Sequence, residues 1–210
     1  MAAMHRSRPS PPARPTRIRL FRNEQLERLT VIAPRTFFVL WACMLPFIAW
    51  MGWNTASPLH AVGLVIAGFV GWSLFEYAMH RYLFHWTVQW APARWLVYLA
   101  HGNHHDDPND GMRNLMPPAV SLPIAGVIWL ALVAAIGPAG TWAFLGFMIG
   151  YVSYDVVHYG CHQWAMHSRI GQAFKRHHMR HHHISESGNY AITALFWDRA
   201  FGTQITSLKR

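Results

Sequence analysis

Histidines at helical spacings are the residues of this chain whose types and positions point to chemistry. Of the 15 histidines, 13 fall between positions 80 and 183, and ten of these form four clusters. The clusters are HRYLFH (His80 and His85), HGNHH (His101, His104 and His105), HYGCH (His158 and His162) and HMRHH (His178, His181 and His182). So many imidazoles in two short parts of the chain indicate a common task.

The spacing shows which imidazoles can share a helical face. Residues at i, i+3 and i+4 lie on one side of an α-helix, so the second and fourth clusters would each present three imidazoles within about 100° of arc. The third cluster is an i, i+4 pair. His80 and His85 are five residues apart, about 140° round a helix of 3.6 residues per turn. We expect these two to serve different centres unless the helix breaks between them.

Ten converging imidazoles cannot all be protonated, because like charges at contact distance repel. Neutral imidazole is instead a good ligand for iron, zinc, copper or nickel. Ten ligands divided between two metal ions give five each, which leaves one open place on a six-coordinate ion where dioxygen or water would bind. A structural zinc site needs only four ligands and no vacancy. The sequence therefore predicts a two-metal site, with His177 beside the fourth cluster as a substitute ligand.

Two carboxylates near the ends of apolar stretches are candidates to hold ligating imidazoles in place. Glu76 precedes His80 by four residues, and Asp155 precedes His158 by three. Carboxylates commonly accept the second N–H of a metal-bound imidazole, and ionisable groups within membrane spans are costly enough to imply a role. The alternative is that both carboxylates only make helix ends soluble.

The rest of the chain predicts a membrane protein that carries these histidines. Of 210 residues, 52% are hydrophobic and 13% are charged, against about 25% charged residues in soluble domains. Four largely uncharged stretches, at 36–53, 58–76, 119–136 and 139–157, approach the roughly 20 residues that cross a bilayer. The connections NTAS and GP are short. The expected fold class is an all-α integral membrane protein with four transmembrane helices in two hairpins.

Basic residues indicate which way the spans face. All 18 Lys and Arg residues lie before position 36, between 81 and 113, or from 169 onwards, and none lies in the two hairpin loops. The positive-inside rule makes that side cytoplasmic, so both termini and all four histidine clusters are expected there. Four buried helices of a soluble protein would not predict this segregation. The net charge of +9 is therefore attributed to topology, and nucleic acid is not an expected partner.

Segments outside the spans complete the predicted architecture. Residues 1–35 are basic, with proline and serine near the start, and predict a largely disordered cytoplasmic N-terminal segment rather than a signal peptide. Residues 36–210 then form the functional domain. The stretch APARWLVYLA (91–100) is too short to span and predicts a cap helix lying on the membrane. Cys43 and Cys161 make no disulfide framework and are expected to be free thiols.

Four longer motifs occur in order: EYAMHRYLFH, HGNHHDDPND, GYVSYDVVHYGCH and FKRHHMRHHH, the last followed by WDRAFGT. Together they resemble the fatty acid hydroxylase superfamily of membrane di-metal oxygenases, over about residues 35–203. HRYLFH, LMPP and GYVSYD favour the branch of fatty acid 2-hydroxylases, which act on sphingolipid acyl chains. Gln163 departs from the pattern, because the family often has another histidine there.

The resemblance implies a di-iron centre that activates dioxygen and inserts one oxygen atom into a C–H bond of a lipid acyl chain. The ten clustered histidines would be its ligands, and zinc can occupy such a site in preparations. Eukaryotic fatty acid 2-hydroxylases often carry a fused haem domain that delivers electrons, for which 35 residues are too few. We therefore expect a separate donor with its reductase, a ferredoxin or a cytochrome b5-like protein. Charge steering would dock it on Arg169, Lys175, Arg176 and Arg180.

Two other functions compete with this interpretation. A sterol or other lipid desaturase would use the same metal site but leave a double bond instead of a hydroxyl group. A histidine-rich metal transporter or sensor should carry its ligands near the bilayer midplane. The middles of all four predicted spans lack histidine and charge, which counts against the transporter.

Overall fold

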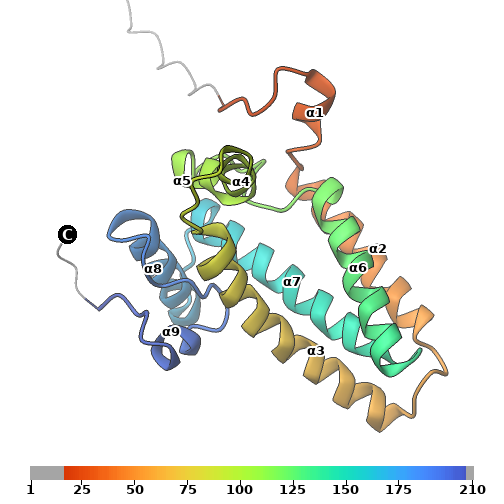
Figure 1. Ribbon diagram of the computed structural model, residues 1–210. Coiled ribbons are helices and arrows are strands. Elements are labelled where there is room, and N and C mark those ends of the chain that lie inside the picture. Colours follow the sequence, from red (N-terminus) through yellow and green to blue (C-terminus); the bar gives the residue numbers. More distant parts are fainter. Residues whose placement is uncertain (1–16, 207–210) are drawn as a thin grey trace, which may run out of the picture.

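The computed structural model describes residues 17–206, which form α-helices, two π-helical segments and connecting turns, with no strand among them (Figure 1). In chain order the elements are α1 (Glu24–Arg28), α2 (Pro34–Met51), α3 (Pro58–Ala78), η1 (Met79–Phe84), α4 (Ala91–Val97), η2 (Tyr98–Gly102), α5 (Asn103–Asp106), α6 (Pro118–Ile136), α7 (Gly140–Gln163), α8 (Arg169–His183) and α9 (Phe196–Ala200). The all-helical fold expected from the sequence is confirmed.

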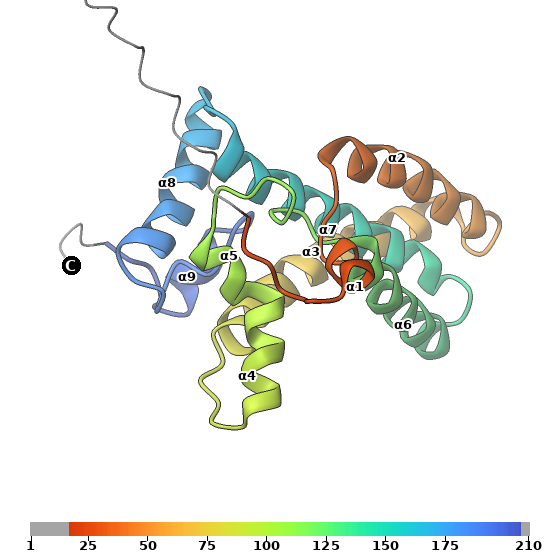
Figure 2. The same cartoon turned by 90° about the horizontal axis from the view of Figure 1, so that it is seen from above.

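Four long helices, α2, α3, α6 and α7, correspond to the four predicted spans, and the first three pack around α7 (Figures 1 and 2). Proline suits the first turn of a helix, because the backbone N–H groups of that turn have no hydrogen-bond partner within the helix, so a residue without an N–H loses nothing there. Pro34, Pro58 and Pro118 open α2, α3 and α6 in this way. The α2–α3 and α6–α7 links lie together at the end of the bundle farthest from α8.

Within residues 17–206, three helices are long and apolar enough to cross a membrane: Pro34–Met51, the continuous helix Pro58–Phe84, and Pro118–Ile136. By contrast, α7 lies at the centre of the bundle, where 14 of its 24 residues are buried. A helix that faces other helices instead of lipid does not need a uniformly apolar surface, which accounts for its glycines and tyrosines. The structure therefore has three candidate spans, and the fourth stays a prediction.

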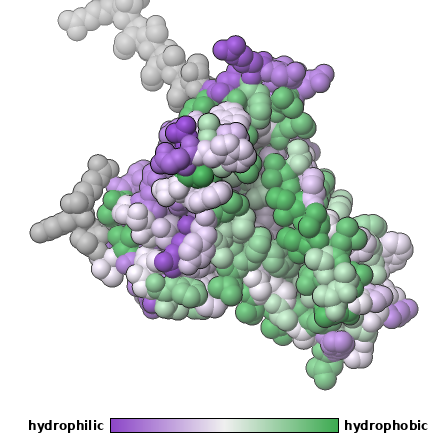
Figure 3. Space-filling model, viewed as in Figure 1, coloured by the Kyte–Doolittle hydropathy of each residue, from purple (hydrophilic) through white to green (hydrophobic). Residues whose placement is uncertain are grey.

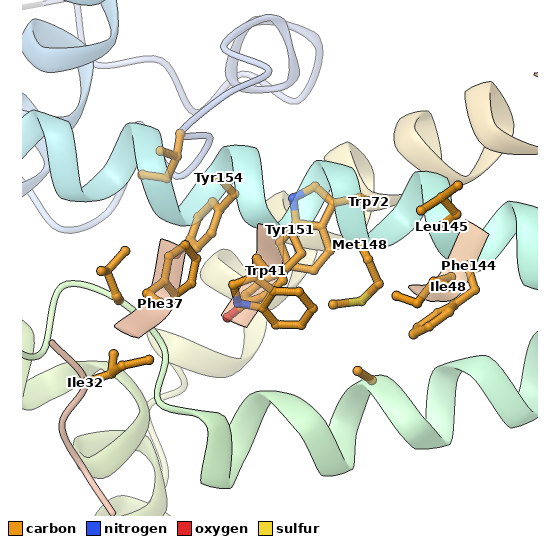
Figure 4. Packing of buried hydrophobic residues seen from close by; sticks show 13 residues of the cluster. Ile32, Phe37, Trp41, Ile48, Trp72, Phe144, Leu145, Met148, Tyr151 and Tyr154 are labelled. Carbon is orange, nitrogen blue, oxygen red and sulfur yellow. The ribbon is translucent and has the colours of Figure 1, made fainter. Parts of the chain in front are cut away.

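Aromatic side chains join α2, α3 and α7 in the core (Figure 4). The Tyr151 ring on α7 lies edge-on to Trp41 of α2, with centroids 5.2 Å apart, and to Trp72 of α3 at 5.4 Å. Phe37 adds a fully buried ring from α2. Because edge-to-face pairs contribute about 0.5–1.5 kcal/mol beyond area burial, this cluster helps to fix the rotation of each helix relative to α7.

Glycines allow α3 and α7 to approach more closely than other residues would. A Cβ added to Gly146 would lie 1.9 Å from the carbonyl oxygen of Val65, and one added to Gly68 would lie 1.9 Å from that of Ala143. A Cβ at Gly150, one turn after Gly146, would meet an α3 side chain at 2.6 Å. Small residues four apart are a common basis of close packing between membrane helices. These glycines therefore set the distance between α3 and α7.

The short helices α4, α5, α8 and α9 gather at one end of the bundle, where α5 and α8 carry seven histidines. The stretch predicted to form a cap helix does form α4, whose Trp95 and Leu96 side chains are exposed. In Figure 3, hydrophobic side chains cover the long helices, and hydrophilic ones gather over the cap and the N-terminal segment. This distribution suits a protein with one end in water and its long helices in lipid.

Residues 17–35, expected to belong to a largely disordered segment, instead pack on this cap. The Glu27 carboxylate accepts hydrogen bonds from the backbone N–H groups of Leu20 and Phe21, at 3.0 and 2.8 Å. It also pairs with Arg113 at 2.5 Å, and the same guanidinium donates to the carbonyl oxygen of Ile18. These partners lie far apart in the chain, so the local composition did not reveal them. Residues 1–16 lie outside the described part.

Gly146→Ala should destabilise the protein by about 1–3 kcal/mol, because the added methyl group meets the α3 backbone, which no rotamer change can relieve. Gly126→Ala on α6 is the matched control, since nothing lies within 4 Å of the added atom. It should be neutral or slightly stabilising. Thermal unfolding of both variants in detergent micelles measures the difference, and equal stability would contradict the close α3–α7 packing.

Candidate metal centre

The ten histidines of the four sequence clusters gather into two groups of five. Histidine group 1 consists of His80, His85, His101, His105 and His181, and histidine group 2 of His104, His158, His162, His178 and His182. Within each group, the ring nitrogens that could bind an ion all lie within 4.8 Å of one another. The structure thus brings together all ten residues identified from the sequence, in the division of five and five that the sequence analysis expected.

The Nε2 atoms point toward one another within each group. In group 1 the Nε2 atoms of His85 and His181 lie 3.0 Å apart, and in group 2 those of His162 and His178 lie 2.8 Å apart. A neutral imidazole has only one N–H, so converging Nε2 atoms cannot all hydrogen-bond to one another. Lone pairs directed at a common centre are instead what a metal ion requires.

The π-helical segment η1 places His80 and His85 in the same group, which corrects the expectation that they serve different centres. Hydrogen bonds in a π-helix run between residues five apart, so His80 and His85 come to lie on one face. Their rings stack with centroids 5.1 Å apart and an interplanar angle of 27°. The expectation failed because it assumed 3.6 residues per turn. Single π-helical turns of this kind are frequent at functional sites.

Two of the sequence clusters supply histidines to both groups. In HGNHH, His101 and His105 belong to group 1, and His104 belongs to group 2. On α8, His181 belongs to group 1, whereas the other two histidines of its cluster belong to group 2. The rings of His105 and His182 stack across the groups with centroids 4.3 Å apart. The two groups are therefore adjacent parts of one site.

Backbone carbonyl oxygens hold three of the imidazoles through their other nitrogen, Nδ1. The pairs are His80 with Tyr190 (2.6 Å), His181 with Gly188 (2.8 Å) and His158 with Asn114 (3.1 Å). A carbonyl oxygen can only accept a hydrogen bond, so each of these Nδ1 atoms carries the proton. The Nε2 atom of each ring then keeps its lone pair for a metal ion.

Burial keeps the imidazoles of the cap uncharged. It lowers the pKa of His85 and of His105 to about 4, and the pKa of His181 to about 3. The pKa of His104 and of His178 also falls well below its usual value, first because both rings are buried and then because neighbouring imidazoles would repel a further positive charge. At neutral pH these rings are ready to donate lone pairs to a metal ion.

Glu76 holds a loop that contacts an imidazole, whereas the sequence predicted direct contact between the carboxylate and the imidazole. Its carboxylate accepts hydrogen bonds from the backbone N–H groups of Ile192 and Thr193, at 2.6 and 3.0 Å. These contacts hold the loop whose Tyr190 carbonyl oxygen accepts the Nδ1 proton of His80. The carboxylate therefore orients the imidazole through a loop and not by direct contact.

Asp155 repeats this arrangement for group 2. Its Oδ2 atom accepts a hydrogen bond from the backbone N–H of Met116 at 3.1 Å. Two residues earlier in the same segment, the Asn114 carbonyl oxygen accepts the Nδ1 proton of His158. Both carboxylates are almost completely buried, which rules out the alternative that they serve only to make helix ends soluble.

His177 belongs to neither group, which corrects its identification as a substitute ligand. Its Nε2 atom lies 2.9 Å from Oδ2 of Asp198. The same carboxylate accepts hydrogen bonds from the backbone N–H groups of Tyr190 and Ala191, both at 2.9 Å. Burial alone would raise the pKa of Asp198, but these hydrogen bonds lower it. Sequence reasoning missed Asp198, because no periodic spacing links it to His177, 21 residues away.

An apolar cavity of about 610 Å³ leads to both groups. It is lined by α3, α4, α6, α7 and the N-terminal segment, and it reaches His101 of group 1 and His104 and His158 of group 2. Along α7 the lining residues extend from His158 back to Phe147, which is about 16 Å at 1.5 Å per residue. A cavity of this shape and chemistry suits a hydrocarbon chain.

The basic residues predicted to bind an electron donor all lie on α8, which carries three buried histidines on its inner side. Arg169 and Arg176 are exposed, whereas Lys175 and Arg180 are partly buried. The Lys175 ammonium donates a hydrogen bond to the carbonyl oxygen of Trp164 at 2.6 Å. Positive charge therefore lies on the surface directly over the histidine site.

The fold and the site define a class of helical protein with candidate membrane spans. In this class an apolar cavity leads to two histidine groups that are able to hold metal ions. The sequence model of one family, fatty acid hydroxylase, matches residues 65–203, more than half of the chain. The chain belongs to the fatty acid hydroxylase family, and it is an enzyme of lipid hydroxylation. The family resemblance expected from the motifs is confirmed.

Curated relatives and one solved structure agree with this assignment. A dihydroceramide fatty acyl 2-hydroxylase of Arabidopsis thaliana, FAH2, is 32% identical over 187 residues, covering 88% of this chain and 79% of the relative. The fatty acid 2-hydroxylase of Homo sapiens is 30% identical, covering 89% of this chain and 56% of that protein. The hydroxylase domain visible in full-length scs7p matches with a TM-score of 0.79 at 29% identity, covering 86% of this chain and 69% of that chain.

Glu76→Gln and Asp155→Asn should each weaken metal binding about 10–100-fold, as the loss of contacts that support ligating histidines commonly does. Each substitution removes the negative charge that fixes a loop carbonyl against an imidazole. Metal titration of protein stripped by a chelator measures the affinities. His60→Ala, at an exposed position, is the control. Normal binding in both carboxylate variants would contradict their supporting role.

Proposed function

We propose that this chain is a membrane di-iron oxygenase that hydroxylates a lipid acyl chain at C2. The observation that carries the proposal is the position of two five-histidine groups at the end of an apolar cavity. The names of the relatives from Arabidopsis thaliana and Homo sapiens specify 2-hydroxylation of fatty acyl chains. The proposed substrate is accordingly a fatty acid or the N-acyl chain of a sphingolipid.

The set of nitrogen donors suits iron. Each group offers five neutral imidazoles, and its members include no cysteine or carboxylate, so a six-coordinate ion would keep one place open. Bound iron would supply the activation of dioxygen and the transfer of one oxygen atom to a C–H bond. Zinc binds the same ligands and can occupy the site in a preparation.

The chain's own residues position the substrate and exclude water. The acyl chain would lie along α7, between the lining residues of α3 and α6, with its reacting carbon beside His101, His104 and His158. Filling the cavity with hydrocarbon expels water, which prevents side reactions at the site. A hydrocarbon chain offers no polar group to bind. The position of the acyl chain along the cavity therefore depends on where the polar end of the lipid is held.

We also propose that α7 is a fourth span and that the histidine cap faces the cytoplasm. Support comes from charge: the three regions that hold every Lys and Arg are joined to one end of the long helices, and the two hairpin links at the other end hold none. Both termini would then be cytoplasmic. The domain of residues 36–210 would carry the cap on which residues 17–35 pack.

His181→Ala should lower the amount of 2-hydroxylated lipid more than about 100-fold, because it removes a buried member of group 1 at the centre of the site. Mass spectrometry of lipids from cells with and without the gene, and with each variant, measures the product. His60→Ala, at an exposed position far from both groups, should leave product levels close to normal. A new double bond instead of a hydroxyl group would favour the desaturase, and full activity of His181→Ala would contradict the proposed ligand set.

The reaction needs an external source of electrons, because converting R–H and O₂ into R–OH and H₂O consumes two electrons and two protons. We propose a small acidic electron carrier, a ferredoxin or a cytochrome b5-like protein with its reductase. It would dock on the α8 surface formed by Arg169, Lys175, Arg176 and Arg180. Opposite charges raise encounter rates between such partners.

The double substitution Lys175→Glu and Arg176→Glu should slow reduction by the carrier about tenfold at low ionic strength, since it reverses the charge that steers the encounter. Stopped-flow reduction, with metal content measured in parallel, tests this. Arg28→Glu is the matched control, because that side chain is 78% exposed and lies on α1, outside the docking surface. Reduction that depends neither on salt nor on this double substitution would place the donor elsewhere.

A further inference from the structure

The loop between α8 and α9 contacts two members of histidine group 1. Its Gly188 carbonyl oxygen accepts a hydrogen bond from Nδ1 of His181 at 2.8 Å. Its Tyr190 carbonyl oxygen accepts one from Nδ1 of His80 at 2.6 Å. The two histidines come from different elements, α8 and η1. Asn189 lies between the two carbonyl groups, so one residue is placed to influence both imidazoles.

The backbone of Asn189 is left-handed, with φ at 54°. Residues with a Cβ atom rarely adopt this conformation, and asparagine is among the few that tolerate it. A right-handed or extended backbone at this position would turn the peptide units on its two sides relative to each other. The left-handed conformation therefore helps to set the angle between the Gly188 and Tyr190 carbonyl groups.

The peptide units that carry these two carbonyl oxygens are also held on their opposite sides. The Asn189 N–H donates a hydrogen bond to the carbonyl oxygen of Thr203 at 2.9 Å. The Ala191 N–H donates one to Oδ2 of Asp198, also at 2.9 Å. In a planar trans peptide unit the C=O and the N–H point in opposite directions. A hydrogen bond at the N–H therefore also fixes the direction of the carbonyl oxygen.

The Asn189 side chain ties the loop to the segments beside it. Its Nδ2 atom donates a hydrogen bond to the carbonyl oxygen of His177 at 2.9 Å, and its Oδ1 atom accepts one from the N–H of Ile205 at 2.7 Å. Asn189 is completely buried, so an apolar substitute would leave both backbone groups without a partner. A Cβ atom on Gly188 would lie 2.5 Å from the carbonyl oxygen of Thr203. The loop and the C-terminal segment are therefore in close contact.

We propose that Asn189 is a positioning residue for histidine group 1. Its left-handed backbone and its buried amide aim two carbonyl oxygens, which in turn direct the Nε2 lone pairs of His80 and His181 toward one metal ion. The inference rests on metal binding by group 1, which the proposed function requires. It also extends the site to residues 203–205, because that segment holds both the backbone and the side chain of Asn189.

The zinc-loaded full-length protein tests the inference without turnover. In Asn189→Ala, the Nδ1 protons of His80 and His181 should exchange with deuterium about tenfold faster, because the hydrogen bonds that protect them are weakened. NMR of protein with isotope-labelled histidine measures the rates. The Nδ1 proton of His158 should exchange as in the unchanged protein, since its acceptor is the Asn114 carbonyl oxygen. Zinc affinity, measured by competition with a chelator, should fall about 10–100-fold.

Asn54→Ala is the matched control. Asn54 also has a left-handed backbone, with φ at 62°, but it lies in the α2–α3 link at the end of the bundle farthest from α8. The control should change neither zinc affinity nor the three exchange rates. Asn189→Gly keeps the left-handed conformation and removes only the amide, so its effects should be smaller than those of Asn189→Ala. If Asn189→Ala does not fold, Asn189→Gly provides the same comparison of exchange rates.

Unchanged exchange at His80 and His181 in the Asn189 variants would overturn the inference. Equal acceleration at His158 would also overturn it, because that result would indicate a general loosening of the fold. Faster exchange at the two group 1 histidines in a protein that makes no 2-hydroxylated lipid would contradict the proposed function and leave the role of Asn189 standing. Normal 2-hydroxylation, with exchange rates that do not respond to Asn189, would do the reverse.

Discussion

The structure depends on directing ten nitrogen lone pairs inward, although neutral imidazoles have no strong attraction for one another. For His80 and His158 the same set of contacts directs the ring inward: a buried carboxylate holds a loop, and a carbonyl oxygen of that loop accepts the Nδ1 proton. Glu76 and Asp198 fix the loop that holds His80, and Asp155 fixes the segment that holds His158. Hydrogen bonds to ionised groups are stronger than neutral ones. At Asp198 these hydrogen bonds outweigh the effect of burial and lower the pKa of the carboxyl group.

Helix packing determines where these contacts can form. His80 and His158 lie at the same end of α3 and α7, so the distance between the two histidine groups follows from how closely these helices pack. Gly68 and Gly146 permit that close approach. The same packing leaves a cavity between α3, α6 and α7 that ends at the histidines. A few small residues in the bundle thus determine both the geometry of the site and the space beside it.

Much of this site could be predicted from the sequence, because histidines repeat at helical spacings and basic residues avoid the hairpin loops. Other features carry no local signal. The π-helical turn that aligns His80 with His85 cannot be read from spacing, and a carbonyl oxygen such as that of Tyr190 has no characteristic side chain. Glu27 is bound by Arg113, 86 residues away, so composition wrongly indicated disorder around it. The centre of α7 is less apolar than the other three long helices, because it packs against protein.

The division of two sequence clusters between the groups has a further consequence. HGNHH and α8 each contribute to both groups, so neither group can be rearranged without moving helices that the other group uses. If the groups hold metal ions, the first ion to bind orders the elements that the second ion needs, and the loss of either ion loosens both. Such linkage between folding and binding produces positive cooperativity. The pair of groups should then behave as a single binuclear unit, in which half-loaded protein is scarce.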